Sequence, residues 1–81
     1  MSKPASVEVL HERVAAILRL GQPTMLAGVD PYLEIAARAM RITYVQAKKK
    51  LEEGNAGVRA LRAYVKKAVF SIAYAEGQPV E

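Results

Sequence analysis

Cysteine and tryptophan are both absent from this 81-residue chain. The lack of cysteine rules out disulfides, thiolate metal sites and a cysteine nucleophile, and a reducing cytoplasm is the expected location. Histidine and aspartate each occur once, as His11 and Asp30, and no serine or threonine has a histidine base that the sequence places beside it. Glycine-rich phosphate loops, metal-ligand spacings and dinucleotide fingerprints are missing too. We therefore expect no catalytic residue, no metal and no cofactor, and predict that the protein is not an enzyme.

Long apolar runs are also lacking. The longest stretch without a charge, residues 20–29, is about half a membrane span and includes Pro23 and two glycines. We therefore expect no membrane association. A chain of this length has room for one domain with one small core. Because domains below about 80 residues hold roughly 3–5 kcal/mol in reserve, a homo-oligomer or a place as subunit of a complex is expected.

The first half of the chain carries the signals of two helices. Ser6 is a residue type that caps helices, and the apolar positions behind it recur at steps of three and four until Gly21. Asp30-Pro31 is the strongest start signal, because proline at the first helical position loses no hydrogen bond. The expected inward positions are Val7, Leu10, Val14, Ile17 and Leu18, then Leu33, Ala36, Ala37 and Met40. In the apolar connection between the two helices, Met25, Leu26 and Val29 are expected to pack against the core.

The second half indicates two more helices. Thr43 and Gln46 have the spacing of a capping box, and the helix they start is expected to stop at Gly54-Asn55. The last helix covers roughly residues 56–76, with Gly77 at its end. Its expected inward side is Val58, Leu61, Val65, Ala68, Val69 and Ile72. No segment alternates with a period of two. The sequence thus predicts one all-α domain over residues 1–81, a bundle of about four helices with short flexible ends at 1–5 and 77–81.

Positive charge is concentrated in the middle of the chain. Residues 38–67 contain nine lysines and arginines against Glu52 and Glu53, a net charge of +7 in a chain whose formal net charge is +4. Residues 1–37 have a net charge of −1 and residues 68–81 of −2. An excess this local favours an anionic partner, either nucleic acid or an acidic protein surface. The alternative interpretation of the lysine run at 48–50 is a solvated face balanced by the two glutamates.

The basic segment also contains a tight corner. Helices that end near Met40 and start near Thr43 leave a connection of two or three residues, and residues 35–51 resemble the helix-turn-helix DNA-binding superfamily. Small Ala36 and Ala37 would let the two helices approach closely. In this resemblance Met40 and Ile42 flank the turn, Ala47 and Leu51 are buried, and Arg41 stands where glycine is common.

The resemblance implies roles for the charged and polar residues of the corner. The second helix would be the recognition helix, with its first turn in the major groove. Base edges would be contacted by Thr43, Tyr44, Gln46 and Lys48, and phosphates by Arg38, Arg41, Lys49 and Lys50. A secondary basic stripe on the last helix would consist of Arg59, Arg62 and Lys66.

The end of the last helix is uncharged around almost its whole circumference between residues 68 and 75. A helix that is apolar on every side is usually buried on every side, so this segment predicts a subunit interface. The residues proposed for it are Val69, Phe70, Ile72 and Tyr74. A homodimer would match the paired half-sites that helical DNA readers use.

Two hypotheses follow for function. The first is a small basic, cytoplasmic DNA-binding protein, a helix-turn-helix transcription regulator of phage or plasmid type. The second is a non-catalytic structural or accessory protein that applies a basic face to an acidic partner. Virion components, small subunits of nucleic-acid machines and inhibitors of such machines belong to this second class.

Overall fold

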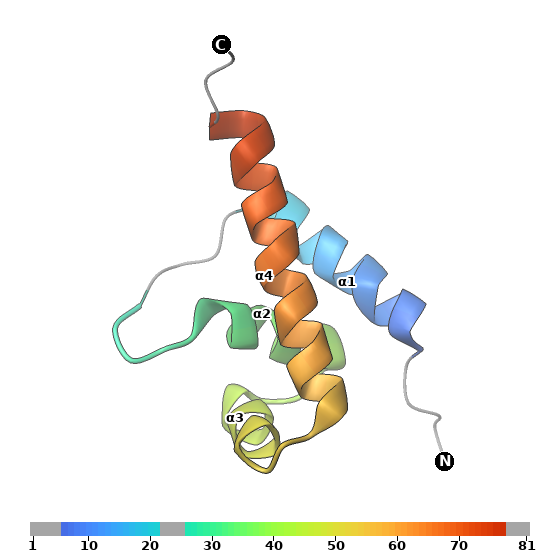
Figure 1. Cartoon of the computed structure of the whole chain (residues 1–81), viewed down its shortest axis with the longest axis vertical. Helices are drawn as coiled ribbons and strands as arrows, with labels where there is room; N and C mark the ends of the chain where they lie inside the picture. Colours follow the sequence, from blue (N-terminus) through green and yellow to red (C-terminus); the bar gives the residue numbers. More distant parts are fainter. Residues whose placement is uncertain (1–5, 22–25, 78–81) are drawn as a thin grey trace.

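The structure is a computed structural model that describes residues 6–21 and 26–77, with the side chains of residues 72–77 excluded. The described residues form four helices: α1 (Val7–Leu20), α2 (Pro31–Met40), α3 (Tyr44–Glu52) and α4 (Ala56–Gly77). No strand occurs in the described ranges, so the predicted all-α bundle is confirmed (Figure 1). The ends expected to be flexible lie outside the described residues, except for Gly77, which is the last residue of α4. Within those ranges no helix combines the length and the apolar character that crossing a bilayer demands.

Each helix begins at a side-chain cap. The predicted caps of the first three helices are confirmed, and Thr43 and Gln46 form the full capping box with bonds of 3.0 and 2.9 Å. The fourth cap is Asn55, whose Oδ1 accepts a 3.0 Å bond from the Val58 N–H. These bonds satisfy backbone donors that the first turn of a helix leaves without partners. Local sequence therefore fixes where all four helices begin.

The central element is α2, which contacts the three other helices. Of its ten residues Arg38 alone is exposed. On one side of α2 lies the main cluster, formed by Val14, Leu18, Ile35, Ala36, Ala39, Leu61, Val65 and Val69. On the other lies the corner cluster, formed by Leu33, Ala37, Ala47 and Val58 with half-buried Met40, Ile42, Tyr44 and Leu51 around it. The corner cluster joins α2, α3 and the start of α4.

Two polar or aromatic contacts fasten α1 to the rest of the bundle. Arg13 Nη1 donates a 2.9 Å hydrogen bond to the backbone oxygen of Ala39, in the last turn of α2. A cation is favourable at this end because the last carbonyls of a helix are unpaired and carry partial negative charge. His11 stacks on Tyr64 of α4, with ring centroids 3.6 Å apart. The lone histidine is thus a half-buried packing residue.

Some of the predicted core positions are wrong. Leu26 is 54% exposed, because a turn closed by the Val29 N–H on the Leu26 oxygen leads the chain away from the bundle. Val29 is half-buried, and Met25 lies outside the described residues. Val7 is 64% exposed because it belongs to the first turn of α1, where the apolar stripe finds no neighbouring helix to cover it.

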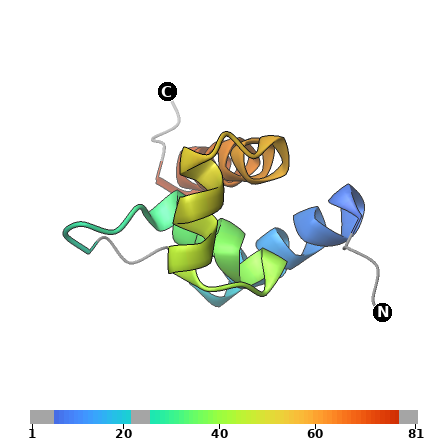
Figure 2. The same cartoon turned by 90° about the horizontal axis from the view of Figure 1, so that it is seen from below.

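The corner between α2 and α3 is closed by a left-handed residue. Arg41 has φ 61° and ψ 41°. Its N–H bonds to the Arg38 oxygen, and the Ile42 N–H bonds to the Ala37 oxygen. This pair of bonds is a Schellman motif, in which the residue after the turn also packs back on the helix. Ile42 does so, in the corner cluster. As a result α3 lies across α2 instead of continuing it (Figures 1 and 2).

The same motif ends α3, but there the left-handed residue is Gly54, with φ 83°. Side chains make this conformation costly, by about 1–2 kcal/mol. We expect Arg41→Gly to raise the free energy of unfolding by about 1 kcal/mol, and Gly54→Ala to lower it by about 1 kcal/mol. A Cβ at Gly54 would meet no atom within 4 Å, so its cost comes from the backbone alone. Urea unfolding of both variants measures this. A loss of stability in Arg41→Gly would contradict the claim that the left-handed backbone of Arg41 is strained.

Candidate nucleic-acid interface

The surface of interest is the side of α3 that faces away from the bundle. Tyr44, Ala47 and Leu51 point inward, because all three belong to the corner cluster or pack against it. Successive helical residues turn by about 100°, so the opposite side carries Val45, Gln46 and Lys49. Lys48 and Lys50 flank that side. We call Val45, Gln46, Lys48, Lys49 and Lys50 the outward face of α3.

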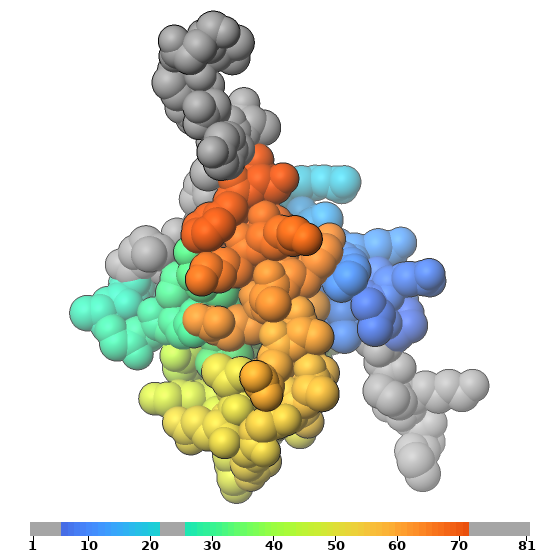
Figure 3. All heavy atoms as spheres, viewed as in Figure 1, coloured from blue at the N-terminus to red at the C-terminus, as the bar shows by residue number. Residues whose placement is uncertain are grey.

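Every residue of the outward face is exposed, and Val45 has 75% of its surface accessible. The helix lies at one end of the described molecule, in the lower part of Figure 3. None of its three lysines takes part in an ion pair with a residue in the described ranges. The outward face is therefore free to meet a large anionic partner. Lys49 and Lys50 belong to the last turn of α3, and Glu52 and Glu53 follow at its C-terminal end, so part of the positive charge of the outward face is offset there.

The capping box fixes the two polar side chains at the start of α3. Thr43 Oγ1 accepts from the Gln46 N–H, and Gln46 Oε1 accepts from the Thr43 N–H. The Thr43 hydroxyl hydrogen and the Gln46 amide hydrogens remain as donors. A glutamine that contacts base edges can pair bidentately with adenine, but here that pairing would use an oxygen that already accepts one bond. Both side chains are exposed and held in one orientation.

Tyr44 has a different position from the one predicted. Its side chain is half-buried against the corner cluster, and its hydroxyl oxygen accepts a 3.0 Å bond from the Asp30 N–H. The ring thus joins the start of α3 to the start of α2. We therefore remove Tyr44 from the set of groups that face outward, and assign it a role in setting the corner.

Arg38 and Arg41 complete the basic surface of the corner. Arg38 is exposed in the last turn of α2, and Arg41 is exposed in the turn itself. Because the corner joins the end of α2 to the start of α3, both guanidinium groups belong to the same end of the molecule as the outward face. The side chains at this end therefore present five cations, from Arg38, Arg41, Lys48, Lys49 and Lys50.

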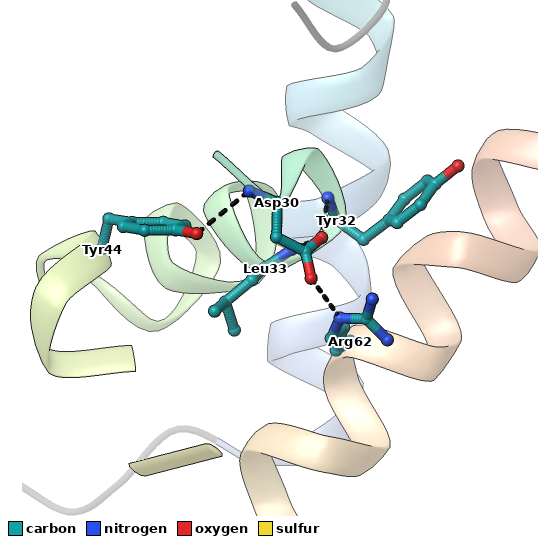
Figure 4. Close-up of polar contacts among 5 residues, drawn as sticks. All are labelled: Asp30, Tyr32, Leu33, Tyr44 and Arg62. Atoms are coloured by element: carbon teal, nitrogen blue, oxygen red, sulfur yellow. Dashed lines mark hydrogen bonds and ion pairs between the residues drawn. The ribbon is translucent and has the colours of Figure 1, made fainter. Parts of the chain in front are cut away.

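Asp30 connects three helices behind this surface (Figure 4). Its Oδ1 caps α2 by accepting from the N–H groups of Tyr32 and Leu33, at 3.0 and 3.2 Å. Its Oδ2 lies 2.7 Å from Arg62 Nε on α4, and its backbone N–H donates to Tyr44 on α3. Partial burial raises the pKa of the Asp30 carboxyl. The hydrogen bonds from Arg62, Leu33 and Tyr32, with the charge of Arg62, outweigh burial and leave that pKa below its ordinary value.

The secondary basic stripe on α4 is therefore interrupted. Arg62 is half-buried, its charge is paired with Asp30, and its guanidinium lies 5.9 Å from the centre of the Tyr32 ring. Arg59 and Lys66 are exposed. Lys66 Nζ lies 5.9 Å from the centre of the Phe70 ring. The two remaining cations are separated by a neutralised residue, so this stripe is a weaker anionic docking surface than the corner.

The residues proposed for a subunit interface are divided by the structure. Val69 is 8% exposed and belongs to the main cluster, so it packs within the chain. Phe70 is 51% exposed, with its ring in edge contact with Tyr32 at 6.2 Å between centroids. The side chains of Ile72 and Tyr74 lie outside the described residues. The uncharged character of this segment is thus partly explained by burial inside the bundle.

Val45 is the residue of this surface that the sequence analysis did not name. Its signal was available in the sequence, because Val45 is not one of the positions expected to be buried in this helix, Ala47 and Leu51. The Asp30–Arg62 ion pair was also missed, and no local pattern could have found it. No cluster of potential metal ligands occurs among the described residues. Comparison of the chain with models of known protein families, with curated proteins and with solved structures found no match.

Proposed function

We propose that the protein binds duplex DNA, and that the outward face of α3 enters the major groove. The observation that carries the proposal is the geometry of the corner: α3 lies across α2 and presents its first turn and three lysines to solvent. In helix-turn-helix proteins the N-terminal residues of the second helix contact base edges. Here the exposed residues of that first turn are Val45 and Gln46, and the Thr43 cap precedes them.

In this proposal the five cations of the corner contact the phosphates of the DNA backbone. Lysine and arginine contacts with phosphates set the position and orientation of a protein on DNA without reading its sequence. Arg38 and Arg41 lie on the side of α2 and the turn, and Lys48 and Lys50 flank the outward face. In this arrangement cations stand on both sides of the groove-facing residues. The proposal is a sequence-reading regulator of the phage or plasmid type, acting in the cytoplasm as a homodimer.

Salt-titrated binding tests this function. The full chain is mixed with a labelled duplex of random sequence, and fluorescence anisotropy gives the affinity over a range of salt concentrations. About four phosphate contacts predict that the logarithm of the binding constant falls with the logarithm of salt with a slope of about −4. An affinity that does not change with salt would contradict the proposal. No binding even at low salt would favour the accessory protein with an acidic partner.

A further inference from the structure

Val45 is the one exposed apolar side chain of α3. The other apolar residues of this helix, Tyr44, Ala47 and Leu51, are buried or half-buried in the corner cluster. Val45 is 75% exposed and lies in the first helical turn, on the side opposite to the core. Its neighbours on that side are Gln46 and Lys49, which are both polar. It contributes nothing visible to packing within the bundle.

The edges of base pairs in the major groove are mostly polar. They present hydrogen-bond donors and acceptors, and the one methyl group among them is the C5 methyl of thymine. A valine side chain has no hydrogen-bonding group, so this methyl is the group on the groove floor that it complements. Valine also has one strongly preferred rotamer in a helix. Its two methyl groups therefore have a fixed place relative to the Gln46 and Thr43 side chains, which the capping box holds.

We propose that Val45 is a specificity-determining residue that contacts the C5 methyl group of a thymine. This inference rests on the proposed function, because it places the first turn of α3 in the major groove. It adds what the cations of the corner cannot supply, namely a preference for one base. The duplex sites that the protein prefers then contain a thymine at a fixed position.

Deoxyuridine provides the test, because it pairs as thymine does and lacks only the methyl group. A preferred duplex is first selected from a randomised pool with the full wild-type chain. Each thymine of the selected duplex is then replaced singly by deoxyuridine, and affinities are measured for wild type, Val45→Ala and Lys67→Gln. Lys67 is an exposed cation on α4, outside the outward face. Alanine has the higher helix propensity, so Val45→Ala stays folded.

We expect one replacement to weaken wild-type binding about fourfold, the factor that corresponds to one buried methyl group. Lys67→Gln keeps that difference, and Val45→Ala binds the thymine and deoxyuridine duplexes equally. A selected duplex without a fixed thymine, or the same fourfold difference in Val45→Ala, would overturn the assignment of Val45. Those results leave DNA binding itself intact. A wild-type chain that binds no duplex overturns the proposed function together with this inference.

Discussion

Replacement of Lys48, Lys49 and Lys50 by glutamine is expected to weaken binding to duplex DNA on the order of a hundredfold at about 0.1 M salt. Each phosphate that a cation neutralises releases counterions and contributes about −0.9 to the salt slope. The loss of two to three such contacts therefore lowers the affinity and flattens the slope by about 2. The fold should be unaffected, because all three side chains are exposed and glutamine has a similar helix propensity. Anisotropy titration over a range of salt measures both quantities.

A matched control separates the position of the charges from their number. Lys49→Gln with Lys50→Gln removes two cations from the outward face, and Arg19→Gln with Lys67→Gln removes two exposed cations from α1 and α4. The first pair is expected to flatten the salt slope by about 2, and the second pair to leave it nearly unchanged. Equal effects would mean that net charge drives binding and that the outward face has no special part.

Replacement of Asp30 by alanine is expected to lower the free energy of unfolding by about 2 kcal/mol. Loss of a helix N-cap costs about 1 kcal/mol, and loss of the partly exposed pair with Arg62 adds up to about 1 kcal/mol. Because a domain of this size has roughly 3–5 kcal/mol in reserve, the effect is a large fraction of the total. Urea unfolding followed by circular dichroism measures it.

Asn55 provides the matched control for Asp30. Its side chain caps α4 by accepting a hydrogen bond from the Val58 N–H, and it carries no charge. Asn55→Ala should therefore cost about 1 kcal/mol, the value of a cap alone. If the two alanine variants lose equal stability, the pair of Asp30 with Arg62 contributes nothing.

Asp30 also makes the stability of the fold depend on pH. The folded-state pKa of Asp30 is lowered, so its contribution is fully present above the ordinary aspartate pKa of about 3.9. It is lost as the pH falls through the folded-state value, because protonation removes the charge that Arg62 pairs with. Asp30→Asn keeps the capping oxygen and removes that charge. The stability gap between wild type and Asp30→Asn should therefore narrow below about pH 4. A gap that stays constant to pH 2 would contradict the depressed pKa.

The helices were predictable because their signals are local. Ser6, Asp30 and Thr43 each cap a backbone N–H within three residues, so a short stretch of sequence contains both partners. Gly54 ends α3 for a similar reason, since it adopts the left-handed backbone without a steric penalty. Arg41 adopts that backbone too, where the pattern favours glycine. There the apolar spacing of Met40 and Ile42 was the better guide to the turn.

The contacts that set the corner could not be read from the sequence. Arg62 lies 32 residues from Asp30, and Tyr44 lies 14 residues from it, so both bonds depend on how the helices pack. The same limit explains the core positions missed in α2. Ile35 and Ala39 are both buried, although neither is among the inward positions that the sequence predicts for this helix. Because α2 is buried on several sides, its core positions follow no single apolar stripe.

Nuclear magnetic resonance mapping of the DNA-binding surface tests the central claim most directly. Backbone amide shifts of the labelled full chain are followed while a duplex of random sequence is added. We predict that the largest changes fall on residues 43–50, with smaller ones at Arg38 and Arg41 and little change along α1. Changes confined to α1 or α4, with α3 unmoved at saturation, would contradict the claim that the outward face of α3 meets DNA.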